Sequence, residues 1–163
     1  MGNKIRLLVV DDEERFLDTL SRRLSLRDFD VTAFSSGAKA VEAARYTEFE
    51  LALVDLKMPG MSGEEVLRTL KKEHPFIEVV ILTGHGSVES AVDCVKAGSR
   101  HFLQKPAETE TLLTVLKDAY EERLRKRLAA DDEKTEQLQR IALGESPLGI
   151  LRKMKELDAK TRT

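Results

Sequence analysis

The chain alternates between short segments rich in apolar residues and longer segments in which apolar residues recur every three or four positions. The run over residues 5–10, apolar except for Arg6, predicts a strand that is buried on both faces. Four further short segments, over residues 30–34, 51–55, 78–83 and 100–104, are also expected to be strands. The periodic segments that follow each run predict helices with one apolar face. Strand and helix alternate five times through short connections. This order predicts a doubly wound α/β fold, in which helices cover both faces of a five-stranded parallel sheet.

Capping signals mark the ends of several predicted helices. Ser62, with Glu65 three residues on, predicts a capping box at the start of the third helix. Ser87 or Gly86 opens the fourth helix, and Gly98 suits its C-terminal end. The residues expected to face inward from the fourth helix are Val88, Ala91, Val92 and Val95.

A long helical extension is predicted after the fifth strand, because nothing breaks a helix between Glu108 and Gly144. Its apolar stripe comprises Leu113, Leu116, Tyr120, Leu124 and Leu128. A second amphipathic segment follows, with Leu148, Leu151, Met154 and Leu157. We divide the chain into a domain over residues 1–122 and a helical extension over 123–163 that holds no recognisable output domain. The extension is expected to dimerise or to dock on a target; a passive helix packed on its own domain is the alternative.

Polar side chains stand where four predicted strands end: Asp11, Asp12, Asp55, Thr83 and Lys105. In an open parallel sheet, ligands bind outside the carboxyl ends of the strands, so these side chains should converge. Clustered carboxylates repel one another and attract a hard cation such as Mg²⁺, which also binds phosphate oxygens. An aspartate can act as a nucleophile toward phosphorus, and a lysine supplies a point charge to phosphoryl oxygens.

Each of these residues also has a simpler interpretation when it is taken singly. The acid pair could cap a helix, and Asp55 could be a turn residue. Thr83 could cap or turn the chain, and Lys105 could be a solvated surface lysine. The combination at the ends of four strands of one sheet favours a site for a divalent metal and a phosphoryl group.

The motifs at these positions resemble the receiver domain of two-component response regulators, over roughly residues 4–120. The matching segments are Asp11-Asp12, Asp55 with Met58-Pro59-Gly60, Thr83-Gly84, Ala97-Gly98 and Phe102-Leu103-Gln104-Lys105-Pro106. The resemblance implies the flavodoxin-like receiver fold and a phosphorylation-activated signalling switch. Such a switch accepts a phosphoryl group from a sensor histidine kinase, a phosphotransfer protein or a small phosphodonor. It assists its own phosphorylation and dephosphorylation, and it is not a turnover enzyme.

The resemblance also implies a role for each site residue. Asp55 would be the phosphoacceptor, and Lys105 and Thr83 would bind the phosphoryl oxygens. Mg²⁺ would be held by Asp12 directly, by Asp11 through water, by Asp55 and by the backbone carbonyl of Lys57. Thr83 and Phe102 would form the switch pair, and the Lys105-Pro106 bond would be cis. The chain departs from many relatives in having Phe102 instead of tyrosine, so any inward swing must be driven by packing.

Composition and charge limit the kinds of partner that the chain is expected to bind. The net charge of −2 and the lack of a basic recognition helix give no reason to expect nucleic-acid binding. No apolar stretch is long enough to span a bilayer and no signal-peptide pattern opens the chain, so a cytoplasmic protein without a membrane partner is expected. The single cysteine, Cys94, is expected to be a small apolar residue on a helix.

Three rival functions stay open at this point. A metal-dependent phosphatase of the dehalogenase type also uses an aspartate nucleophile, but its second acid would stand where Lys57 is. A flavodoxin-like cofactor protein would need a phosphate-binding loop where the acidic residues 11–14 are. The chain could also be the receiver fragment of a larger transcription activator, since residues 144–147 faintly resemble the opening of an ATPase module.

Overall fold

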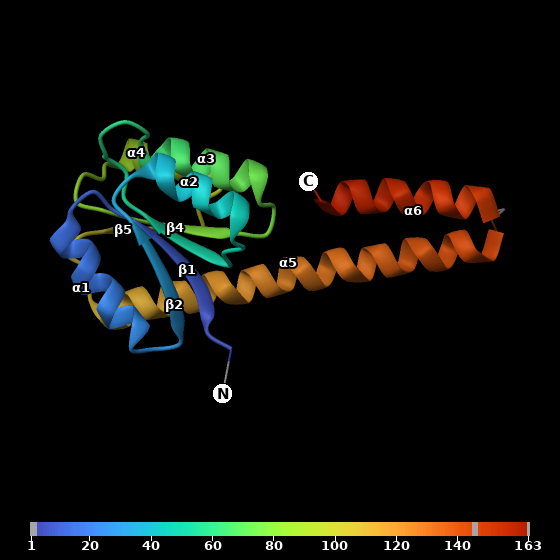
Figure 1. Ribbon diagram of the computed structural model, residues 1–163, viewed down its shortest axis with the longest axis horizontal. Coiled ribbons are helices and arrows are strands. Elements are labelled where there is room, and N and C mark those ends of the chain that lie inside the picture. Colours follow the sequence, from blue (N-terminus) through green and yellow to red (C-terminus); the bar gives the residue numbers. More distant parts are fainter. Residues whose placement is uncertain (1–2, 145–146, 163) are drawn as a thin grey trace. The chain divides into compact units, whose positions relative to one another are not determined.

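A computed structural model of the chain describes residues 3–144 and 147–162, and its core is a five-stranded parallel sheet. The strands are β1 Ile5–Val10, β2 Phe29–Phe34, β3 Leu51–Val54, β4 Glu78–Thr83 and β5 His101–Gln104, in the order 2-1-3-4-5. The helices are α1 Glu14–Ser25, α2 Gly37–Tyr46, α3 Gly63–Glu73, α4 Val88–Lys96, α5 Thr109–Gly144 and α6 Pro147–Arg162. The predicted doubly wound sheet is confirmed (Figure 1).

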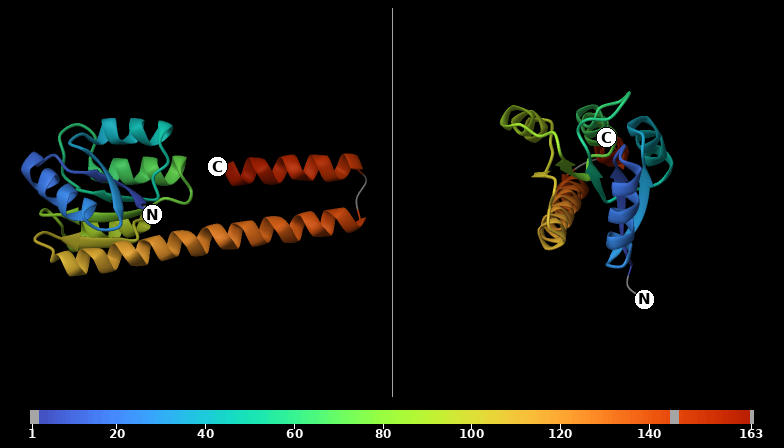
Figure 2. Two further views of the ribbon diagram at one scale, coloured as in Figure 1. Left: turned by 60° about the horizontal axis from the view of Figure 1, so that its bottom comes forward. Right: turned by 90° about the vertical axis from the view of Figure 1, so that its left-hand side faces the viewer.

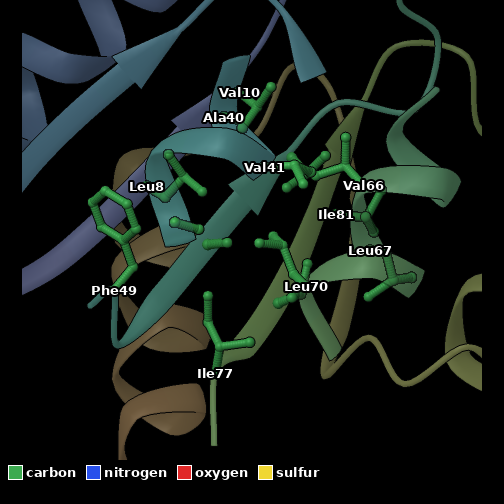
Figure 3. Packing of buried hydrophobic residues seen from close by; sticks show 14 of the residues in the cluster. Leu8, Val10, Ala40, Val41, Phe49, Val66, Leu67, Leu70, Ile77 and Ile81 are labelled. Atoms are coloured by element: carbon green, nitrogen blue, oxygen red, sulfur yellow. The ribbon is translucent and has the colours of Figure 1, made fainter. Parts of the chain in front are cut away.

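Two hydrophobic clusters pack against the two faces of the sheet, because neighbouring strand residues point to opposite sides. Leu8 and Val10 of β1 belong to the cluster beneath α2 and α3, together with Val66, Leu67 and Leu70 of α3 (Figure 3). The intervening β1 residues Leu7 and Val9 belong to the cluster beneath α1 and the first part of α5. Figures 1 and 2 show α1 and this part of α5 on the opposite side of the sheet from α2 and α3. Strand β3, at the centre of the sheet, is therefore apolar throughout, whereas β4 begins with the buried Glu78 and ends with the buried Thr83.

The register of the sheet brings the ends of the strands together. Val10 lies beside Val54, and Val54 beside Ile81. Backbone pairing continues one residue past the strands: Asp55 N donates to the Val10 carbonyl at 2.9 Å, and Lys105 N donates to the Thr83 carbonyl at 2.9 Å. The polar residues that follow the strands therefore leave the sheet along one edge.

The predicted capping signals are present. Ser62 accepts a hydrogen bond from Glu65 N, and the Glu65 carboxylate accepts one from Ser62 N, which completes the capping box of α3. Ser87 caps α4 in the same reciprocal way with Ser90. Gly98 follows α4 with φ +105°, a conformation that glycine adopts without a steric penalty.

The predicted inward face of α4 is wrong for its three valines. Val88, Val92 and Val95 are 85%, 45% and 58% exposed, and Ala91 is half-buried. The buried residue of α4 is Cys94, which confirms the expected role of the cysteine. Residues 91, 94 and 97 form a second stripe of helical period with smaller side chains, and this stripe faces the sheet. Spacing alone does not distinguish the two stripes.

The chain forms two compact units, Met1–Arg123 and Leu124–Thr163, and the division falls within α5. In the first unit, α5 buries Leu112, Leu116 and Ala119, while Leu113 and Tyr120 are partly buried. In the second unit, the Leu124 and Leu128 side chains are 43% and 63% exposed.

Within the second unit, Lys134 Nζ of α5 lies 2.6 Å from Asp158 Oδ1 of α6, and Leu157 is half-buried. The other three residues of the predicted second stripe, at positions 148, 151 and 154, have side chains outside the described part of the chain. Among the described residues, no helix is long and apolar enough to cross a membrane. The division into a functional domain over residues 1–122 and an extension over 123–163 stays a prediction.

Candidate metal centre

Three carboxylates meet at the carboxyl edge of the sheet. Asp11 and Asp12 follow β1, Asp55 follows β3, and one ligand oxygen of each lies within 4.8 Å of the others. Asp11 and Asp55 are buried, and Asp12 is half-buried. Burying like charges this close is unfavourable unless a cation or a proton relieves the repulsion.

Lys105 brings a positive charge into this cluster from the end of β5. Its Nζ lies 2.6 Å from Asp11 Oδ2, 3.8 Å from Asp55 Oδ2 and 3.9 Å from the Glu13 carboxylate. Only 12% of the lysine side chain is exposed, so the ammonium is not a solvated surface charge. Its peptide bond to Pro106 is cis, as the resemblance implied. One ammonium cannot neutralise three carboxylates, which leaves net negative charge for a further cation.

Asp55 is held in place by hydrogen bonds at the end of its strand. Its Oδ1 accepts a hydrogen bond from Leu56 N at 2.9 Å. The Thr83 hydroxyl lies beside the carboxylate and favours its ionised form. Burial raises the pKa of Asp55, and the negative charge of Asp11 raises it further; these effects outweigh Thr83, Lys105 and Leu56, which lower it. A divalent cation placed here would stabilise the ionised, nucleophilic form of the carboxylate.

Thr83 and Phe102 lie on the neighbouring strands β4 and β5, and Thr83 is the one beside Asp55. Thr83 is fully buried, and its hydroxyl accepts a hydrogen bond from His85 N at 3.2 Å. Phe102 is half-buried and packs against the cluster beneath α2 and α3. A Cβ built on Gly86 would lie 2.8 Å from the Phe102 ring, so glycine at this position allows the ring to reach the β4–α4 loop.

Sequence reasoning missed Gly63, which fixes the loop after Asp55. A Cβ built on Gly63 would lie 1.9 Å from the Asp55 carbonyl oxygen, and Gly63 N donates to the Leu56 carbonyl at 2.7 Å. The start of α3 is therefore in direct contact with the backbone of the candidate phosphoacceptor. The available signal was the Ser62-Gly63 pair at the start of an acidic helix, which was interpreted only as a capping signal. The Lys57 side chain is exposed; the role of its carbonyl stays a prediction.

The donor set suits a hard divalent cation. Mg²⁺ binds carboxylate oxygens and keeps several waters, and the three carboxylates offer oxygen ligands from buried and half-buried positions. A phosphoryl site also needs groups that can bind an anion, and Lys105 and Thr83 beside Asp55 are groups of this kind. The structure thus brings all five predicted strand-end residues to one pocket.

Comparisons with known proteins agree with this geometry. Residues 7–117 match the response regulator receiver domain family. The chain is 35% identical over 118 residues to the photosynthetic apparatus regulatory protein RegA of Rhodovulum sulfidophilum, an alignment that covers 71% of this chain and 63% of RegA. The chain thus spans less than two thirds of that relative's length.

Two solved structures share the fold. The solution structure of the beryllofluoride-activated NtrC4 receiver domain dimer has a TM-score of 0.69 and 34% identity, and the match covers 72% of this chain and 98% of that one. The CheX–CheY complex with BeF₃ and Mg²⁺ from Borrelia burgdorferi has a TM-score of 0.66 and 22% identity, over 71% of this chain and 89% of that one.

This chain belongs to the response regulator receiver domain family, and a long C-terminal helix follows its receiver fold. Members of the family are phosphoacceptors of two-component systems and not classical enzymes. The acidic pocket of Asp11, Asp12 and Asp55 is consistent with a phosphorylation-activated switch. Family membership also implies that a kinase or another phosphodonor acts on the chain.

Proposed function

We propose that Asp55 accepts a phosphoryl group from a histidine kinase, a phosphotransfer protein or a small phosphodonor, and that this reshapes a partner-binding face. The observation that supports this most is the convergence on a buried Asp55 of two carboxylates, an ammonium and a hydroxyl. Asp55 Oδ attacks phosphorus, the bond from phosphorus to the donor breaks, and the donor group leaves with the bonding electron pair.

The residues around Asp55 hold the transferred group. The Lys105 ammonium, 3.8 Å from Asp55 Oδ2, turns from Asp11 toward one phosphoryl oxygen. The Thr83 hydroxyl turns from the carboxylate toward another. Mg²⁺, bound by Asp12, by Asp11 through water, by Asp55 and by the Lys57 carbonyl, would neutralise the charge that develops on the phosphoryl oxygens. The Mg²⁺ in the Borrelia burgdorferi complex supports this choice of metal.

Intact-mass spectrometry with acetyl phosphate and Mg²⁺ tests the phosphoacceptor. The native chain should gain a phosphoryl adduct, and Asp55→Asn should gain none. Asp30→Asn removes an exposed carboxylate on β2 and should keep the adduct. An undiminished adduct on Asp55→Asn would overturn the assignment.

Titration calorimetry with Mg²⁺ alone tests the metal ligands. Asp12→Ala removes a charged ligand and should weaken Mg²⁺ binding by about tenfold. Glu14→Ala removes an exposed acid on the first turn of α1 and should leave the affinity nearly unchanged. Equal Mg²⁺ affinities in the two variants would show that Asp12 is not a metal ligand.

We also propose that α5 pairs with the same helix of a second chain. Leu124 and Leu128 are exposed one turn apart, and an apolar helix face is stable in water only against a partner. The NtrC4 receiver domain, a relative, forms a dimer. Sedimentation equilibrium should show that the double variant Leu124→Lys, Leu128→Lys self-associates less than the native chain. The control Leu26→Lys, at an 86% exposed position of another segment, should self-associate as strongly as the native chain. If all three are monomers with and without beryllofluoride, the pairing does not occur.

A further inference from the structure

We propose that Phe16 is a positioning residue for Lys105: the face of its ring holds the ammonium inside the pocket and supports it while it turns from Asp11 to the phosphoryl group on Asp55. The inference rests on the proposed function. It assigns to a residue of α1, outside the group of side chains at the strand ends, an effect on the rate of phosphoryl transfer.

The Lys105 ammonium lies close to the face of the Phe16 ring. Lys105 Nζ lies 4.0 Å from the centroid of the Phe16 ring. A cation within about 6 Å of a ring centroid is attracted by the negative face of the ring, and the attraction is stronger where water is excluded. The lysine is largely buried and has carboxylates on its other side, with Asp11 Oδ2 at 2.6 Å. The ammonium therefore lies between an aromatic face and a group of anions.

The ring is useful because the ammonium must change partners. At rest Lys105 is closest to Asp11, and Asp55 Oδ2 is 3.8 Å away. A hydrogen bond to a carboxylate oxygen is directional and is lost when the ammonium turns, whereas the attraction to a ring face is broad and persists over a small displacement. Phe16 thus keeps the ammonium near the reacting group throughout the turn, and a group held in place lowers the entropic cost of the transition state.

The position of Phe16 on α1 fits this role. It lies in the first turn of the helix, a few residues after the acid pair, and it is half-buried where Leu20 and Leu24 of the same stripe are buried. Phe16 also lines a cavity of about 330 Å³ together with Leu20, Ala107 and Leu112. The ring is therefore not closely packed on every side, and the cavity leaves room for the larger indole of tryptophan.

The alternative is that Phe16 only fills space in the core. Ring size and ring electrostatics can be separated, because fluorine atoms on the ring weaken its negative face while nearly preserving its shape. A space-filling ring is insensitive to this change, whereas a ring that attracts a cation loses the attraction stepwise.

The test is the rate of Asp55 phosphorylation by acetyl phosphate with Mg²⁺ in the full chain, with phenylalanine, monofluoro-, difluoro- and pentafluorophenylalanine placed at position 16. The rate should fall with each step, to about 3- to 10-fold below native for the pentafluoro ring. Phe16→Leu should fall similarly, and Phe16→Trp should equal or exceed the native rate. The same series at Phe29, a buried ring at the opposite end of the sheet, should be flat.

The outcomes separate the two proposals. A native chain that gains no adduct on Asp55 contradicts the proposed function, and this inference with it. A native chain that is phosphorylated while the series at position 16 is flat, or follows the series at Phe29, contradicts the role of Phe16 alone. A rate that rises with fluorination would mean that the ring hinders the turn of Lys105, which also overturns the inference.

Discussion

Helices α3 and α4 cover the same face of the sheet and differ sharply in how firmly they are attached. α3 buries Val66, Leu67 and Leu70 completely, whereas α4 buries only Cys94 and exposes its three valines. Both begin with a reciprocal cap, so capping does not explain the difference. The difference follows from apolar burial, because burial supplies most of the stability of a packed helix.

The two helices are also joined differently to the candidate phosphorylation site. α3 begins at Gly63, in contact with the Asp55 backbone, and is fixed there by the core. α4 follows a loop in which a Cβ built on Gly84 would meet no atom within 4 Å, while Gly86 lies against the Phe102 ring of β5. Elements that bury few apolar contacts open and shift at the lowest free energy. We therefore expect a signal from Asp55 to reach α4 and β5, and to leave α3 in place.

The largest expected effect is at the start of α3. Gly63→Ala places a Cβ in the Asp55 carbonyl and should lower the free energy of unfolding by about 4 kcal/mol, because the backbone must move. Gly84→Ala, the matched glycine before α4, should change it by less than about 0.5 kcal/mol. Urea unfolding measures both. Equal effects would mean that the two helix starts are equally constrained.

Core truncation should separate the bodies of the two helices. Leu67→Ala removes a fully buried side chain of α3 and should cost about 3 kcal/mol of stability. Val92→Ala removes a partly exposed side chain of α4 and should cost about 0.5 kcal/mol or less. The same urea titration measures both. A loss of more than about 2 kcal/mol for Val92→Ala would show that α4 is as firmly packed as α3.

The smallest expected effect concerns the attachment of β5 to α5. Arg100, through a hydrogen bond at 2.9 Å, and His101, at 2.6 Å, lower the pKa of Asp118 to about 2. The folded pKa lies below the unfolded value of about 3.9, so the stability from this pair is present above about pH 4 and is lost as the pH falls through 2. Carboxyl ¹³C titration should show the Asp118 pKa rising toward its unfolded value in Arg100→Gln. An unchanged value would mean that Arg100 does not hold Asp118.

The strands and the pocket were predictable because both follow from local rules. Short apolar segments between amphipathic helices identified the strands, and the alternation of strand and helix identified the sheet as parallel. Residues after parallel strands leave the sheet along one edge, which brought Asp11, Asp55 and Lys105 together. The inward face of α4 was not predictable, because valines and smaller residues form two stripes of equal period. Phe16 and Gly63 act through contacts with Lys105 and the Asp55 backbone, which lie far away in the sequence and depend on how α1 and α3 pack.

The most direct test of the difference between α3 and α4 is the map of backbone amide shifts when beryllofluoride and Mg²⁺ bind to the full chain. Shifts are expected at Asp55 and Thr83 and should extend through residues 88–97 and 100–104, while residues 66–73 of α3 change little. The Asp55→Asn chain, as a control, should show no such shifts. Shifts confined to the pocket, or equal in α3 and α4, would show that the signal from Asp55 does not pass selectively to α4 and β5.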